Sequence, residues 1–102
     1  MPKLDSQNRL NIPNQLMEIA ETDFSSEIRI YATGKEMYLD NPSKKTSPKK
    51  CFGQVNVDQK GRFIVPKLLR EIFNLKPGDN FALYVLNGRI TFRKIVFIPE
   101  NR

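Results

Sequence analysis

The sequence predicts a mainly β, α+β domain in which one strand–turn–strand–helix–hairpin unit occurs twice. The stretch from Val57 to Ile72 reappears in degraded form from Leu4 to Ile19, at a constant offset (57 − 4 = 53). In both copies apolar residues alternate with the two-residue period of half-buried strands. The chain of 102 residues suits one ordinary domain with a single core. Because one such unit cannot bury its own apolar face, we expect the two copies to share that core.

The turn between the first two strands is the best-preserved part of the repeat. Asn8 in the first copy and Gly61 in the second stand just before an arginine. Both residue types tolerate a positive φ, so the repetition predicts a left-handed backbone at this position. Identical residues at the common offset include Asp5 and Asp58, Arg9 and Arg62, Pro13 and Pro66, and Leu16 and Leu69.

The remaining elements follow from local signals. Short strands are expected at residues 3–5 and near 9–12 and 62–65, and a further strand at 51–57. The prolines that follow 9–12 and 62–65 end a strand and suit the first position of a helix of about two turns. Hairpins are expected at 27–39 and 81–97, the second with a type I′ turn at Asn87-Gly88. Spacing at i, i+3 and i+4 predicts the apolar helix faces Leu16, Ile19 and Ala20, and Leu69, Ile72 and Phe73.

Composition divides the chain into three parts. Residues 1–40 form the degenerate repeat, residues 41–51 a basic linker rich in Pro, Ser and Lys, and residues 52–102 the second repeat, with both repeats in one compact domain. Net charge is −3, +4 and +5 in these parts, which gives +6 in total. Such clustering favours a polyanionic partner, nucleic acid before an anionic membrane. Charge alone is equally compatible with a basic surface that has no nucleic-acid role.

The rare residue types narrow the chemistry. The chain has no His and one cysteine, Cys51, so an internal disulfide, the usual zinc ligand sets and a Cys/His catalytic pair cannot be assembled. We therefore expect neither an enzyme nor a cofactor or metal. Cys51 is interpreted as an inert residue, with a redox role as the alternative. No stretch resembles a signal peptide or a membrane span, so a cytoplasmic protein without a membrane partner is expected.

The second copy carries a family signature. The string from Asp58 to Arg70, DQKGRFIVPKLLR, followed by LKPGD from Leu75 to Asp79, resembles the AbrB/SpoVT swapped-hairpin family. The pattern covers much of residues 54–94, while residues 4–39 repeat it without its Gly and its helix Arg. Two copies in one chain are most similar to the MraZ branch, in which chains are usually longer.

This resemblance implies both a fold and a function. It implies two repeats that interleave their hairpins into an intramolecular pseudo-dimeric, β-barrel-like body with one short helix per repeat. It also implies a prokaryotic, double-stranded DNA-binding transcription regulator, or an antitoxin. In the first copy Asn14 and Met17 replace Lys67 and Arg70, so DNA is expected to be held mostly by the second copy and the linker. The residues expected at DNA are Arg9, Lys60, Arg62, Lys67 and Arg70, with the linker residues Lys49 and Lys50.

Plainer interpretations stand beside these expectations. Each repeated Arg follows an Asp by four residues, so an ion pair that holds the turn is as well supported as a phosphate contact. The aromatic residues follow strand periodicity and are expected in the core or on a sheet face before they serve as base-stacking platforms. The alternative function is an antitoxin-like or adaptor module with a protein partner, although only a short tail follows the last strand. A homodimer of pseudo-dimeric chains, supported by apolar residues at 95–98, also stays open.

Overall fold

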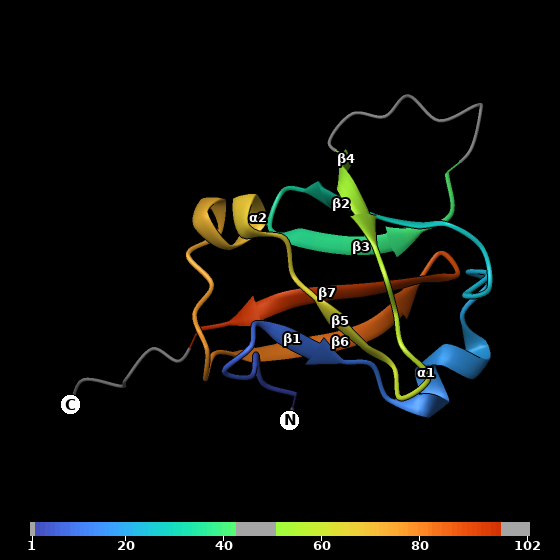
Figure 1. The fold of residues 1–102 in the computed structure, drawn as a ribbon, viewed down its shortest axis with the longest axis horizontal. Helices are drawn as coiled ribbons and strands as arrows, with labels where there is room; N and C mark the ends of the chain where they lie inside the picture. The colour runs from blue at the N-terminus through green and yellow to red at the C-terminus, as the bar shows by residue number, and fades with distance from the viewer. Residues whose placement is uncertain (1, 43–50, 97–102) are drawn as a thin grey trace.

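The computed structural model describes residues 2–42 and 51–96 (Figure 1). In these ranges the chain is mainly β, with short helices that each follow a three-residue strand and its proline. The elements in chain order are β1 (Arg9–Asn11), α1 (Asn14–Ile19), β2 (Ile28–Thr33), β3 (Glu36–Asp40), β4 (Cys51–Val55), β5 (Arg62–Ile64), α2 (Lys67–Ile72), β6 (Asn80–Leu86) and β7 (Arg89–Ile95).

The strands form two antiparallel sheets that face each other. A 5-stranded sheet has the order β4-β2-β3-β7-β6, and β1 pairs with β5 across one face of it (Figure 1). The core lies between the sheets and contains Phe63, Phe81 and Phe92, which are at most 1% exposed. A barrel-like body was expected, but the two sheets stay separate in the described residues, so the expectation of a closed barrel was wrong. Pro13 and Pro66, which lack an N–H, follow the short strands closely and prevent the ladder from continuing.

Strand pairing joins residues that lie 53 positions apart in two places. In the β1–β5 pair, Leu10 lies opposite Phe63 (63 − 10 = 53). In the β3–β7 pair, Tyr38 lies opposite Thr91 (91 − 38 = 53). The flanking pairs are arranged symmetrically about each of these centres. Each of these two ladders is therefore centred on a pair of residues that are 53 positions apart.

The turns agree with the sequence-based expectations. Asn8 and Gly61 have φ values of 64° and 84°, so both occupy the left-handed region expected before the arginines. Asn87 and Gly88, with φ values of 54° and 77°, connect β6 to β7 as a type I′ turn requires. The expected strand at residues 3–5 is replaced by a single bridge between Lys3 and Asn80.

The helix faces differ from the expectation at one position in each helix. Ile19 is 64% exposed and Ile72 is 56% exposed, so neither belongs to the buried face. The core-facing side of each helix instead continues through Ala20 and Phe73, four residues after Leu16 and Leu69, and both of these residues pack against the core. Leu69 is buried and Leu16 packs against the core with part of its side chain exposed.

Candidate nucleic-acid interface

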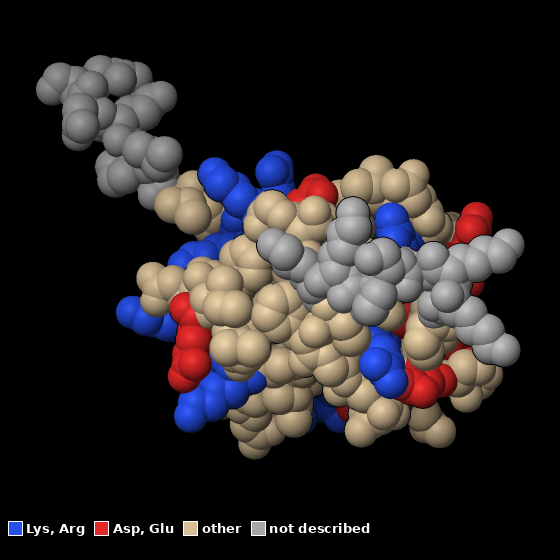
Figure 2. Space-filling model, turned by 90° about the horizontal axis from the view of Figure 1, so that it is seen from above, with Lys and Arg blue, Asp and Glu red and all other residues tan. Residues whose placement is uncertain are grey.

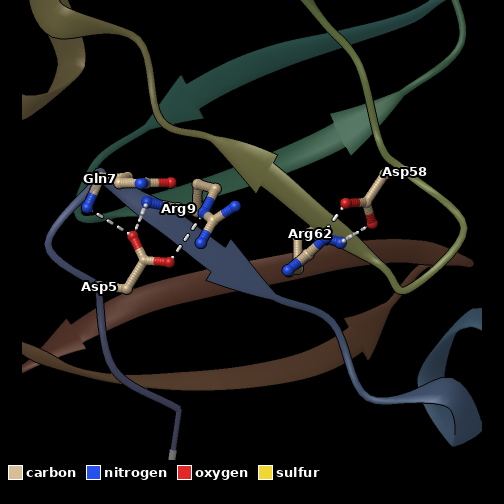
Figure 3. Close-up of polar contacts among 5 residues, drawn as sticks. All are labelled: Asp5, Gln7, Arg9, Asp58 and Arg62. Carbon is tan, nitrogen blue, oxygen red and sulfur yellow. Dashed lines mark hydrogen bonds and ion pairs between the residues drawn. The ribbon is translucent and has the colours of Figure 1, made fainter.

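Strands β1 and β5 carry both repeated arginines on their outward face. Leu10 and Phe63, which alternate with them, point into the core and are buried. Since alternate residues of a strand point to opposite faces, the two arginines share the solvent side and are diagonal neighbours across the pair (Figure 3). The outward row consists of Arg9, Asn11, Arg62 and Ile64.

The turn before β5 is held by the carboxylate of Asp58. Its Oδ1 accepts hydrogen bonds from the backbone N–H groups of Lys60 and Arg62, both at 2.9 Å. Its Oδ2 accepts a hydrogen bond from Nε of Arg62, also at 2.9 Å. The backbone N–H of Arg62 is the main cause that lowers the pKa of Asp58 below its usual value, with the Arg62 side chain adding to it. The carboxylate therefore fixes both the turn and the arginine.

The turn before β1 has the same arrangement. Asp5 accepts hydrogen bonds from the backbone N–H groups of Gln7 at 2.9 Å and Arg9 at 2.8 Å, and from Nε of Arg9 at 2.8 Å (Figure 3). The pKa of Asp5 is likewise lowered, chiefly by the backbone N–H of Arg9. The ion pair expected between each Asp and Arg is thus present in both halves.

These ion pairs leave part of each guanidinium group available. Arg9 and Arg62 use only Nε toward their aspartates, and their Nη atoms form no hydrogen bond with any residue in the described ranges. The side chains keep 31% and 36% exposure. A guanidinium held by its Nε and open at its Nη atoms is pre-oriented to donate to an external acceptor, such as a phosphate oxygen or a guanine edge. Each arginine can therefore hold its turn through the ion pair and also contact DNA.

Crossed backbone hydrogen bonds place each arginine beside the helix of the other half. The N–H of Val65, at the end of β5, donates to the carbonyl of Asn8 at 2.9 Å. The N–H of Ile12, at the end of β1, donates to the carbonyl of Gly61 at 2.8 Å. Arg9 therefore lies next to the start of α2, and Arg62 lies next to the start of α1.

The other basic residues of the second half are positioned by the same elements. Lys60 is exposed in the turn before β5, and Lys67 is exposed at the first position of α2. Arg70 is half-buried, and its Nε donates a hydrogen bond to the carbonyl of Val65 at 3.0 Å. Among the residues that the structure describes, none of these three cations forms an ion pair.

We call the surface of Arg9, Lys60, Arg62, Lys67 and Arg70 the basic surface. It has Arg9, Lys67 and Arg70 toward α2, and Lys60 and Arg62 toward α1. Seen from above, Lys and Arg side chains gather toward the left-hand end of the molecule, the α2 end in Figure 1 (Figure 2). The predicted contacts Lys49 and Lys50 lie outside the described residues.

Three further residues belong to this surface but were not predicted. Asn11 is exposed directly opposite Arg62, and its alternation with the buried Leu10 and Ile12 was a signal that could have found it. Ile64 is 57% exposed opposite Arg9, and Leu68 on α2 is 55% exposed. No charge or motif marks these two residues, because an apolar side chain in a strand or helix is normally expected to face the core.

Other kinds of site were sought in the same ranges. Residues 2–42 and 51–96 contain no group of three or more His, Cys, Asp or Glu side chains arranged to hold a metal ion. No helix in this part of the chain is long and apolar enough to cross a membrane. Cys51 is a half-buried free thiol whose Sγ lies 4.0 Å from an Nη atom of Arg29.

Comparisons of the chain with protein-family models, curated proteins and solved structures find no match.

Proposed function

We propose that this protein is a double-stranded DNA-binding transcription regulator that docks through the basic surface. The observation that carries the proposal is the pair of aspartate-anchored arginines, Arg9 and Arg62, side by side on the outward face of β1 and β5 with open Nη atoms. The strand pair fixes the positions of both arginines. Contacts of this kind with phosphates set the register and orientation of a protein on a duplex. The resemblance of residues 58–79 to the AbrB/SpoVT signature supports the same function.

The proposed architecture is a tandem swapped-hairpin repeat folded as an intramolecular pseudo-dimer. Two observations support it. The elements β1, α1 and β3 begin 53 residues before β5, α2 and β7 (62 − 9, 67 − 14 and 89 − 36 all equal 53). Pairs of residues with the same separation, Leu10 with Phe63 and Tyr38 with Thr91, meet at the centres of two strand ladders. Such a pseudo-twofold unit can align its axis with the local twofold axis of B-DNA.

The crossing of β1 and β5 changes how charge is shared between the two ends of the surface. Arg9 of the first half joins Lys67 and Arg70 at the α2 end, while Lys60 and Arg62 of the second half lie toward α1, where Asn14 and Met17 add no charge. DNA would therefore be contacted at both ends of the strand pair, with the α2 end stronger. This distribution is more even than the one expected from the charges of the two halves.

The proposed mechanism combines positioning and charge. The lysines supply point charges to phosphates, and release of counterions from the duplex provides most of the affinity. The arginines, whose orientation is set by Asp5 and Asp58, donate to phosphates or to base edges. Asn11, exposed between them, adds an amide that can donate or accept.

The test is a titration of the purified chain with a generic duplex at several salt concentrations. We expect micromolar affinity at low salt, and a slope of log K against log salt of roughly −4.5 if about five phosphates are neutralised, at about −0.9 per contact. Binding that does not occur at low salt, or that does not depend on salt, would overturn the proposal. A duplex carrying a pseudo-palindrome should then be sought by selection from random sequences.

The second candidate function is an antitoxin-like or adaptor module that binds a protein. It is favoured by Ile64 and Leu68, which are more than half exposed beside the basic cations. In a DNA interface such side chains contact thymine methyl groups at most, whereas a protein partner would bury them fully. Purification of the tagged chain from its native host would show a stoichiometric small protein that is lost from Ile64→Asn and retained by Ile19→Asn.

A further inference from the structure

Strand β6 exposes backbone groups along its outer edge. It pairs with β7 on one side, and the two-residue turn places Leu86 opposite Arg89 as the first pair of that ladder. In a two-residue hairpin this pair is hydrogen-bonded, and such pairs then alternate along an antiparallel ladder. The N–H and C=O groups of Phe81, Leu83 and Val85 consequently point away from β7.

Only the first of these three residues is covered. The N–H of Phe81 donates to the carbonyl of Pro2 at 2.9 Å, and Lys3 bridges to Asn80. On the opposite edge of the sheet, β4 covers β2 from Ile28 to Tyr31. Within residues 2–42 and 51–96 no strand takes the corresponding place beside the second half of β6. Helix α1 also packs against β6, but no hydrogen bond from a described residue outside the β6–β7 ladder reaches the N–H and C=O groups of Leu83 and Val85.

The composition of β6 suits such pairing. Its sequence NFALYVL has no charged residue and no proline, and its ladder with β7 contains no bulge. Charges, prolines and bulges are among the features by which natural proteins protect an edge strand. On the face of the sheet opposite the core, β6 presents Ala82, Tyr84 and Leu86, of which Leu86 is 45% exposed.

We propose that β6 pairs in antiparallel orientation with β6 of a second copy of this chain, centred on Tyr84. In this register Leu83 of each copy lies opposite Val85 of the other, so every open N–H and C=O on both edges gains a partner. A twofold contact brings the same residues of both copies together, so charged residues at its centre would repel each other. Strand β6 has no charged residue and avoids this repulsion. The pairing joins two 5-stranded sheets into one continuous sheet.

The geometry of the pairing has a consequence that rests on the proposed function. Two antiparallel strands in one sheet are related by a twofold axis perpendicular to the sheet. Both β1–β5 pairs, which pack on the core face, would then lie on the same side of the joined sheet. The dimer would present two basic surfaces in the same direction, as binding to adjacent segments of one duplex requires.

The first experiment measures mass in solution without DNA, by sedimentation equilibrium over a wide range of concentrations. We expect a reversible shift from the 11.8 kDa chain to twice that mass. Leu86→Lys should abolish the shift, because it places a charge at the interface. Leu68→Lys, which makes the same change at an exposed leucine on α2, should retain it. A single 11.8 kDa species at all concentrations, or equal behaviour of the two variants, would overturn the proposal.

The second experiment tests the register by cysteine cross-linking in a Cys51→Ser background. Tyr84 would face its own symmetry mate in a non-hydrogen-bonded pair, with Cα atoms about 4.5 Å apart, which is within the range that a disulfide spans. Tyr84→Cys should therefore form a covalent dimer under mild oxidation, and Arg93→Cys on the neighbouring strand should not. Ala82→Cys and Leu86→Cys should cross-link to each other only when mixed. Cross-linking at Arg93→Cys but not at Tyr84→Cys would rule out this edge, whatever the protein does with DNA.

Discussion

Leu10 and Phe63 face each other at the centre of the β1–β5 ladder, and both side chains are buried beneath it. The Phe63 ring meets Phe92 of the larger sheet edge-on, with ring centroids 5.5 Å apart. One cluster of side chains thus connects the two halves of the chain and both sheets. Because neither half has a core of its own, we expect the domain to unfold as one cooperative unit.

Phe63→Ala should be strongly destabilising. The ring is 1% exposed, and removing a buried Phe costs about 3–5 kcal/mol through lost burial and the cavity that remains. Ile64→Ala, at the adjacent exposed position, should change stability by no more than about 0.5 kcal/mol. Urea unfolding at neutral pH measures both variants. Comparable losses in the two would mean that the β1–β5 pair does not cover the core.

Gly61→Ala should be destabilising for two separable reasons. The residue has φ of 84°, and a Cβ added there would lie 2.6 Å from the backbone carbonyl oxygen of Ile12. The left-handed backbone alone costs of order 1 kcal/mol for a residue with a side chain. Gly34→Ala shares the positive φ but meets no atom within 4 Å, so it reports the backbone cost alone.

The difference in stability between Gly61→Ala and Gly34→Ala measures how closely the backbone at Gly61 approaches Ile12. We expect Gly61→Ala to lose clearly more stability than Gly34→Ala in the same urea experiment. Equal losses would show that β1 and β5 are not held together by the hydrogen bond from Ile12 to Gly61. Asn8→Gly, at a residue that already has φ of 64°, should be close to neutral.

The stability of the domain should fall in acid through the turn aspartates. The pKa of Asp58 is lowered in the folded state from a usual value of 3.8, with the hydrogen bond from the Arg62 backbone N–H as the main cause. A lowered folded pKa means that the stabilisation is complete above the unfolded pKa and is lost as pH falls through the folded pKa. The urea midpoint should therefore be flat near neutrality and fall below about pH 4.

Asp58→Asn is the matched variant for this pH dependence. It should be less stable than the wild type at neutral pH and should show a shallower loss in acid, because the titrating group is gone. Some acid dependence should persist, since the pKa values of Asp5 and Asp23 are also lowered. An unchanged acid slope would contradict a role of Asp58 in holding the turn.

Lys60→Gln and Lys67→Gln should each weaken DNA binding without weakening the fold. Both lysines are exposed and form no ion pair with another described residue, so their loss removes a phosphate contact alone. Each variant should reduce the salt slope by roughly 0.9 and lower affinity similarly for all duplexes. Lys35→Gln, exposed in the turn between β2 and β3, is the control and should leave the slope unchanged.

Substitution of Arg62 requires a different comparison. Its Nε is bound to Asp58, so Arg62→Ala changes the turn as well as the surface. Arg62→Lys keeps a positive charge that can still pair with Asp58, but it loses the planar fork of donors. If the open Nη atoms contact DNA, Arg62→Lys should reduce affinity at unchanged thermal stability, whereas equal affinity would limit the residue to a role in the turn.

Local signals in the sequence were sufficient for a large part of the fold. The positive φ at Asn8 and Gly61, the Asp–Arg ion pairs and the type I′ turn at Asn87-Gly88 each depend on a few neighbouring residues, so they could be predicted from spacing and residue type. The same holds for the mainly β composition, because alternation along a strand reflects a half-buried surface. The same local signals identified the candidate basic residues and the turns that orient Arg9 and Arg62.

What only the tertiary structure decided is how distant segments meet. Within the described residues, β1 pairs with β5, Arg9 lies beside α2, and the two sheets stay separate. These arrangements follow from contacts between residues about fifty positions apart, to which no local pattern refers. Ile19 and Ile72 look like core residues in sequence, yet the side of each helix that packs against the core continues through Ala20 and Phe73 instead. The open edge of β6 has the same origin, because strand order is set by which surfaces become buried together and a strand's own sequence does not record its neighbours.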